Sequence, residues 1–89
     1  MDFMARPDRV IVYTQPGCAG CHAEKAWLSR HGITFEERDI RADPKWLAEL
    51  QALGGKATPA TLVEAGGRRQ LVLGFDEHQL LHALDIPHH

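Results

Sequence analysis

The sequence has few cysteines, few aromatic residues and no excess of charge of one sign. Among its 89 residues only two are cysteine, and aromatic residues make up 7%. A small secreted domain held together by disulfides normally carries four or more cysteines, so that class is excluded. The formal net charge of −2 at pH 7 gives no reason to expect nucleic acid as a partner. We therefore expect the partners to be proteins or small molecules.

Long hydrophobic runs are also missing. No apolar stretch approaches the roughly 20 residues that a membrane-spanning helix needs. The first nine residues lack the apolar middle of a signal peptide. We therefore expect a cytoplasmic protein without membrane contact. Its length suits a single domain, which we place at residues 9–85 between a short arm (1–8) and a tail (86–89). We expect it to be a monomer.

The most informative stretch covers residues 10–25. A β-branched apolar run, Val10 to Tyr13, stops before Pro16-Gly17, and a helix-compatible segment follows directly behind two cysteines spaced Cys18-x-x-Cys21. This pattern predicts a strand, a tight turn and a helix over about 18–31 that carries a dithiol at its start.

A dithiol at a helix N-terminus is suited to redox chemistry. Unpaired backbone N–H groups and the helix dipole both favour a thiolate there, so we expect the pKa of Cys18 to lie below the free value of about 8.5. The spacing places the second sulfur on the same helix face, in reach of a mixed disulfide on the first. Cys18 is thus predicted to attack and Cys21 to resolve.

The remaining pattern alternates strands and helices. On the first helix, the apolar surface is expected from Ala23, Ala26, Trp27 and Leu28. After it we expect a strand over 33–40, a helix begun by Asp43-Pro44 and ended by Gly54-Gly55, strands over 60–64 and 70–73, and a helix over 76–84 capped by Asp76. The fold class is α/β, with the first two strands parallel and the last two antiparallel.

Thr58-Pro59 stands directly before the third strand. Proline cannot donate to a sheet hydrogen bond, so it marks the first residue of a strand, and the sequence leaves its isomer open. In this topology its neighbour would be Cys18.

Together these motifs resemble the glutaredoxin branch of the thioredoxin superfamily, and within it most closely the NrdH-redoxin type. The matching pieces are Val12-Tyr13-Thr14-x-Pro16-x-Cys18-x-x-Cys21, Lys25 and Leu28 before Gly32, Thr58-Pro59, and Gly74-Phe75 before the last helix. The resemblance implies a thioredoxin-like fold, with a four-stranded mixed sheet flanked by three helices, and a thiol–disulfide oxidoreductase.

The resemblance also implies roles for individual residues. Cys18 would be the nucleophile and Cys21 the resolving thiol. The substrate-binding set would comprise Tyr13, Pro16, Thr58, Pro59, Gly74, Phe75 and Asp76, with the backbone of Thr58 pairing with a bound peptide or glutathione. No metal and no tightly bound cofactor are implied.

Two departures from typical glutaredoxins concern the electron donor. Ala19-Gly20 replaces the usual Pro-Tyr between the cysteines, and Gly74-Phe75 replaces a Gly-Gly pair. The phenylalanine is similar to NrdH-redoxins, which take electrons from thioredoxin reductase. Asp76 could still hold the γ-glutamyl end of glutathione, so glutathione remains an alternative co-substrate. The substrate would be a disulfide-containing protein, with ribonucleotide reductase as one candidate.

Other functions compete with this interpretation. One is a glutathione-dependent iron–sulfur module, with a cluster bridging Cys18 of two chains. Cys18-x-x-Cys21-His22 also fits covalent haem attachment, although no export signal accompanies it. A closed zinc site needs four ligands, and His78 and His82 are expected on a solvated helix face. The first strand carries no acid to accept the proton of Cys21, which leaves that step to solvent or His22.

Overall fold

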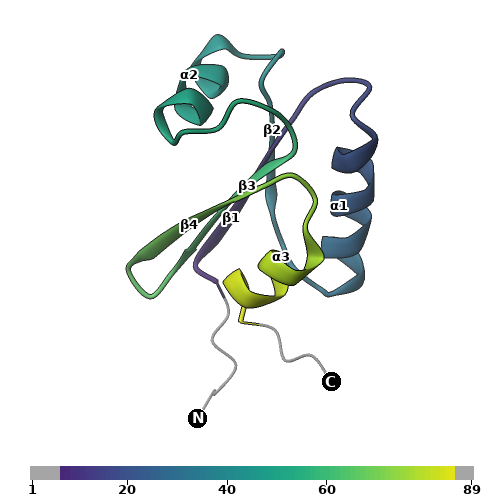
Figure 1. The fold of residues 1–89 in the computed structure, drawn as a ribbon, viewed down its shortest axis with the longest axis vertical. Helices are drawn as coiled ribbons and strands as arrows, with labels where there is room; N and C mark the ends of the chain where they lie inside the picture. The colour runs from purple at the N-terminus through teal and green to yellow at the C-terminus, as the bar shows by residue number, and fades with distance from the viewer. Residues whose placement is uncertain (1–6, 86–89) are drawn as a thin grey trace.

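The computed structural model describes residues 7–85 of the chain (Figure 1). Its elements are β1 (Arg9–Thr14), α1 (Ala19–Arg30), β2 (Glu36–Asp39), α2 (Pro44–Ala52), β3 (Ala60–Ala65), β4 (Arg68–Leu73) and α3 (Glu77–Ala83). This order confirms the predicted thioredoxin-like α/β fold, with its four-stranded mixed sheet and three helices. No helix among these residues is long and apolar enough to cross a membrane.

The sheet has the order β2-β1-β3-β4. β1 pairs in parallel with β2 and antiparallel with β3, and β3 pairs antiparallel with β4. The last pair is joined by Gly66 and Gly67, which have φ of 58° and 77°. Positive φ at both residues is what a two-residue hairpin turn requires. Because β1 lies between β2 and β3 in the sheet, the strand that leads into the dithiol loop is an inner strand with a partner on each side.

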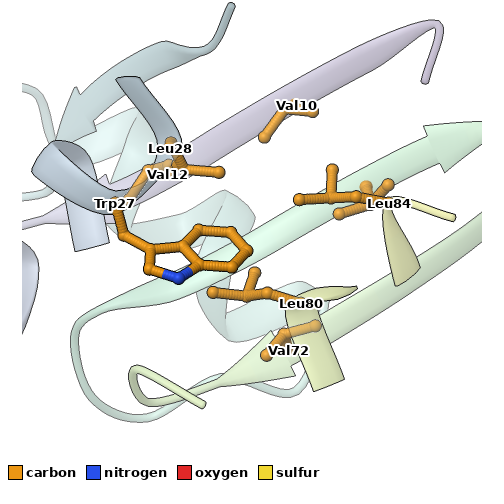
Figure 2. Packing of buried hydrophobic residues seen from close by; sticks show 8 residues of the cluster. Val10, Val12, Trp27, Leu28, Val72, Leu80 and Leu84 are labelled. Carbon is orange, nitrogen blue, oxygen red and sulfur yellow. The ribbon is translucent and has the colours of Figure 1, made fainter. Parts of the chain in front are cut away.

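The sheet separates two apolar clusters. The first core cluster lies between the sheet and helices α1 and α3, and Figure 2 shows Trp27, Leu28 and Leu80 packing there on strand residues. The second core cluster lies on the α2 side, where Leu50 packs on Ile11 and Tyr13. Alternate side chains of β1 enter the two clusters, as the period of a strand requires.

Helix ends follow their sequence signals. The side chains of Asp43 and Asp76 accept from backbone N–H groups at the starts of α2 and α3. At the end of α1, Gly32 has φ of 68°, and the N–H groups of Gly32 and Ile33 donate to the carbonyls of Ser29 and Leu28. This is the Schellman arrangement, which satisfies carbonyls that would otherwise be unpaired.

Two local expectations are corrected. The second strand begins at Glu36 rather than at residue 33, because the N–H of Ile33 is used by the end of α1. Ala23 and Ala26 are exposed, and the buried face of α1 consists of Cys21, Glu24, Trp27 and Leu28. Residues 1–6 of the expected arm and the tail 86–89 lie outside the described residues.

Candidate active site at the dithiol

Cys18 is the N-cap of α1, and its sulfur contacts the start of the helix. The N–H of Cys21 donates to Cys18 Sγ at 3.0 Å. Unpaired N–H groups and the helix dipole favour negative charge at this position, so they stabilise the thiolate of Cys18 once the bond to Cys21 is reduced. The sequence predicts a helix that begins at about residue 18; in the structure α1 begins at Ala19, and Cys18 is its N-cap.

The two cysteines form a disulfide, with their Cα atoms 5.2 Å apart. Their exposure differs, because Cys18 is partly accessible and the Cys21 side chain is only 2% exposed. An incoming thiol or disulfide can reach Cys18 and cannot reach Cys21 directly. This asymmetry suits the predicted division into an attacking and a resolving sulfur.

The Thr58–Pro59 bond is cis, and Pro59 lies against the dithiol turn. A Cβ built on Gly20 would come 3.2 Å from Pro59 Cδ and 4.0 Å from Phe75 Cβ. Gln15 Nε2 donates to Thr58 Oγ1 at 2.8 Å, which ties the loop before the cysteines to the same segment. The structure thus brings together residues from three distant parts of the chain.

Gly74 and Phe75 complete this surface. The N–H of Gly74 donates to the carbonyl of Pro59 at 2.9 Å. Phe75 is half-buried, and its ring meets Trp27 edge-on with centroids 6.3 Å apart. Both oxygens of Asp76 accept from Gln79, at 3.1 Å from the backbone N–H and 3.0 Å from the side-chain amide. Asp76 therefore acts as a helix cap in this structure.

Tyr13 and Pro16 are placed differently from the other predicted substrate contacts. Pro16 is exposed in the loop before Cys18. Tyr13 is 1% exposed in the second core cluster, where its hydroxyl donates to Glu49 Oε1 at 3.1 Å. Burial, with the nearby Glu49 carboxylate, raises the pKa of Tyr13 above its usual value of 10.0. On this evidence Tyr13 packs in the core, and its position gives no support to the prediction that it contacts substrate.

Charged side chains near the dithiol are largely paired with each other. Lys25 Nζ binds both oxygens of Glu37, at 3.0 and 3.2 Å, and Thr14 Oγ1 donates to the same carboxylate at 2.8 Å. The Lys25 and Thr14 hydrogen bonds hold the pKa of Glu37 below its usual range. His22 is exposed. Among residues 7–85, no group of three or more His, Cys, Asp or Glu side chains could hold a metal ion.

One titratable group near the dithiol was missed by the sequence analysis. Glu24, three residues after Cys21, is 0% exposed, and its Oε2 accepts from Thr61 Oγ1 on β3. Its Oε1 is buried and has no hydrogen-bond partner in the part of the chain that the structure describes. Burial raises the pKa of Glu24, although the Thr61 hydrogen bond acts in the opposite direction. The spacing of Glu24 from Cys21 and Leu28, by three and four residues, was the available signal that it faces the core.

Comparisons with known proteins agree with this geometry. The glutaredoxin family model matches residues 10–65. Among solved structures, a mutant of the thioredoxin-like protein BC3987 has a TM-score of 0.80 at 27% identity, covering 90% of this chain and 99% of that one. The glutaredoxin-like NrdH-redoxin from Escherichia coli has a TM-score of 0.69 at 27% identity, covering 83% and 92%. Glutaredoxin from Brucella melitensis has a TM-score of 0.58 at 34% identity, covering 89% and 80%.

Curated relatives with similar sequences are global transcriptional regulators named Spx. Spx 2 of Lactococcus lactis is 35% identical over 69 residues, which is 75% of this chain and 52% of the relative. Spx of Enterococcus faecalis is 43% identical over 44 residues, 49% of this chain and 33% of the relative. The chain thus spans about half, or less, of the length of these regulators. The family-model match, the fold and the Cys18–Cys21 pair show that the chain belongs to the glutaredoxin family, within the thioredoxin superfamily.

Proposed function

We propose that this protein is a dithiol thiol–disulfide oxidoreductase that reduces disulfides of protein substrates. The observation that carries the proposal is the placement of Cys18 Sγ at the start of α1, 3.0 Å from the N–H of Cys21, with Pro59 beside the turn. A partly accessible sulfur in an electropositive position is the arrangement expected of an attacking thiolate. A buried partner sulfur in the same turn suits the resolving step.

The reaction proceeds through two exchanges. The Cys18 thiolate attacks a substrate disulfide, which forms a Cys18–substrate bond and releases the first substrate sulfur as a thiolate. The thiol of Cys21 then loses its proton, and its sulfur attacks Cys18 Sγ and releases the second substrate sulfur. Two electrons have passed from the dithiol to the substrate, and the Cys18–Cys21 disulfide remains. A dithiol donor reduces this disulfide and closes the cycle.

The substrate would lie across Thr58, Pro59 and the start of α3. The backbone of Thr58 would pair with an extended substrate segment as an additional strand. Support comes from the closeness of this segment to the dithiol turn and from the Gln15–Thr58 hydrogen bond, which fixes its side chain. Gly74 and Phe75 would flank the segment on the side of α3, and Pro16 on the side of the loop before Cys18.

For the electron donor, we propose thioredoxin reductase rather than glutathione. Both carboxylate oxygens of Asp76 are already engaged by Gln79, which disfavours their use for the ammonium group of a γ-glutamyl moiety. Phe75 adds an apolar surface beside the dithiol turn, which suits a protein donor better than a charged tripeptide. The similarity to NrdH-redoxin, a glutaredoxin-like protein described by its thioredoxin-like activity profile, supports the same choice.

Cysteine variants test the proposed roles. We expect Cys18→Ser to abolish disulfide reduction, and Cys21→Ser to stop after the first exchange with the substrate covalently bound to Cys18. Mass spectrometry of Cys21→Ser after mixing with an oxidised protein substrate detects that adduct. Reductase activity in Cys18→Ser would overturn the assignment of the nucleophile.

Two coupled assays test the donor. One supplies NADPH with thioredoxin reductase, and the other supplies NADPH with glutathione and glutathione reductase. We expect faster turnover in the first. Equal or faster turnover with glutathione would contradict the proposed donor while leaving the dithiol mechanism intact.

A second candidate function is a redox switch read by a protein partner. The observation in its favour is the similarity to Spx proteins, which are named as transcriptional regulators. A switch needs reversible formation of the Cys18–Cys21 disulfide and no repeated turnover. Multiple turnovers per protein molecule in either coupled assay would favour the oxidoreductase over the switch.

A further inference from the structure

Glu24 is the buried titratable group that the proposed mechanism leaves unused. Its side chain is 0% exposed, yet it carries an oxygen atom without a hydrogen-bond partner among residues 7–85. An ionised carboxylate in this environment is costly because one buried oxygen accepts no hydrogen bond from the described residues. Burial therefore raises the pKa of Glu24. Such a group stabilises the fold less than an apolar side chain of similar size would, so its presence calls for another explanation.

The position of Glu24 links it to the resolving sulfur. Residues three apart on a helix are neighbours on one face, and Cys21 and Glu24 both lie on the buried face of α1. Thr61 holds the carboxyl from β3, the strand that continues from Pro59. In the sheet, Thr61 pairs with Val12 of β1, whose own loop leads to Cys18. Glu24 thus lies between α1 and the sheet, on the helix face that also carries Cys21.

The resolving step needs an acceptor for the proton of Cys21. A thiol in buried surroundings loses its proton to water slowly, and Cys21 is only 2% exposed. His22 is exposed, on the other side of the helix from the buried face. The charged groups at the neighbouring β2 edge, Lys25 and Glu37, are paired with each other. Among the described residues, burial and the Thr61 hydrogen bond alone change the pKa of Glu24, and no charged group contributes.

We propose that Glu24 accepts the proton of Cys21 during the resolving step. This inference rests on the proposed oxidoreductase function and adds a residue to it. The carboxylate of Glu24 takes the proton from the Cys21 thiol, and the Cys21 thiolate attacks Cys18 Sγ and displaces the substrate thiolate. When a dithiol donor later reduces the Cys18–Cys21 bond, the Cys21 sulfur leaves as a thiolate and takes the proton back from the Glu24 carboxyl group. The proton and the two electrons are thereby balanced over the cycle.

Glu24→Gln tests the proposal because glutamine keeps the size and the Thr61 contact but accepts no proton. General bases contribute roughly 10²- to 10⁴-fold to reaction rates, so we expect the resolving step to slow at least tenfold at pH 7. Rapid mixing measures this step for the mixed disulfides of wild type and variant. Its rate should then rise about tenfold per pH unit, because hydroxide replaces the lost base. Glu64→Gln is the matched control, since Glu64 lies on β3 at the end away from Pro59 and pairs with Arg9 and Arg69.

A second measurement does not depend on reductase activity. In a Cys18→Ser background, absorbance at 240 nm follows ionisation of the Cys21 thiol alone. An ionised Glu24 repels the Cys21 thiolate, so adding Glu24→Gln should move that titration to lower pH. The variant would then combine a more acidic thiol with a slower resolving step, a combination that a purely structural role of Glu24 does not produce.

If Glu24→Gln does not fold, Thr61→Val replaces it. This variant retains the carboxyl group and removes the hydrogen bond that lowers the pKa of Glu24, so the pH dependence of the resolving step should move to higher pH. An unchanged rate and pH profile in these variants, or an unchanged Cys21 titration, would overturn the inference. Absence of wild-type activity with both donors would overturn the oxidoreductase function instead, and the Cys21 titration would still measure its coupling to Glu24.

Discussion

Replacing Gly20 with alanine tests the contact on which the substrate surface depends. The added Cβ would lie 3.2 Å from Cδ and 3.7 Å from Cγ of Pro59, and the shorter distance is closer than ordinary van der Waals contact. The Pro59 ring cannot rotate away, since its carbonyl accepts from the N–H of Gly74 and Ala60 already belongs to β3. The first turn of α1 must therefore move by a few tenths of an ångström, together with Cys18.

The size of the effect follows from two opposing terms. Alanine is favoured over glycine in a helix interior by about 1 kcal/mol. Overpacking a closed contact costs about 1–3 kcal/mol. We therefore expect a net loss of up to about 2 kcal/mol in the free energy of unfolding. Because small misplacements of reacting atoms are costly for catalysis, we also expect kcat/KM for disulfide reduction to fall about tenfold.

Urea denaturation of the oxidised protein and steady-state reduction of a protein disulfide measure the two effects. Ala23→Gly is the control, because Ala23 is exposed on the same helix and reports the glycine–alanine difference without the contact to Pro59. The contrary result is a Gly20→Ala variant that gains the stability that Ala23→Gly loses and reduces its substrate at the wild-type rate. That result would mean that Pro59 does not lie close to the dithiol turn.

Three further predictions use the core and the buried carboxyl. Burial raises the pKa of Glu24 above its usual 4.5, so the stability from its protonated form is complete below pH 4.5 and is lost as the pH rises through the folded pKa. Glu24→Gln should therefore have a higher free energy of unfolding than wild type at pH 7–8, by about 1.4 kcal/mol for each pH unit by which folding raises that pKa. In urea titrations this difference should shrink toward pH 4, and a difference that is constant with pH would contradict this origin. Tyr13 is the one tyrosine in the sequence, and its pKa is raised by burial and by Glu49, so absorbance at 295 nm should show phenolate formation above pH 10 in the folded protein and near pH 10 in urea. Phe75→Ala should lower the free energy of unfolding by about 2 kcal/mol, through lost burial and the lost edge contact with Trp27; a loss below about 0.5 kcal/mol in urea titrations would show that the ring is not packed.

Much of the fold could be predicted because local signals agree with the tertiary structure. Asp43-Pro44 and Asp76 mark helix starts by capping chemistry that involves only the adjacent turn. Gly66-Gly67 supplies two residues with positive φ for a hairpin. Such signals act over a few residues, so the sequence contains all the information they need.

Errors arose where distant segments decide the outcome. Periodicity favoured the small apolar residues Ala23 and Ala26 as part of the buried face of α1, and the packing instead buries Glu24 against Thr61, 37 residues away. Tyr13 belongs to a motif that implies substrate contact, and strand alternation directs its ring into the second core cluster; its contact with substrate stays a prediction. The side of an element that becomes buried depends on its partners, which the local sequence does not name.

Because the sheet divides the interior into two clusters, substitutions on one side can affect different properties from substitutions on the other. Within the described residues, the dithiol, Glu24 and Phe75 lie on the side of the first core cluster, while α2 packs into the second. We therefore expect substitutions on the inner side of α2 to change the resistance of the protein to heat or denaturant more than the reactivity of the dithiol. An engineer could redesign α2 to attach a reporter or a new binding surface, provided that the replacement still fills the space of Leu50 beneath Ile11 and Tyr13.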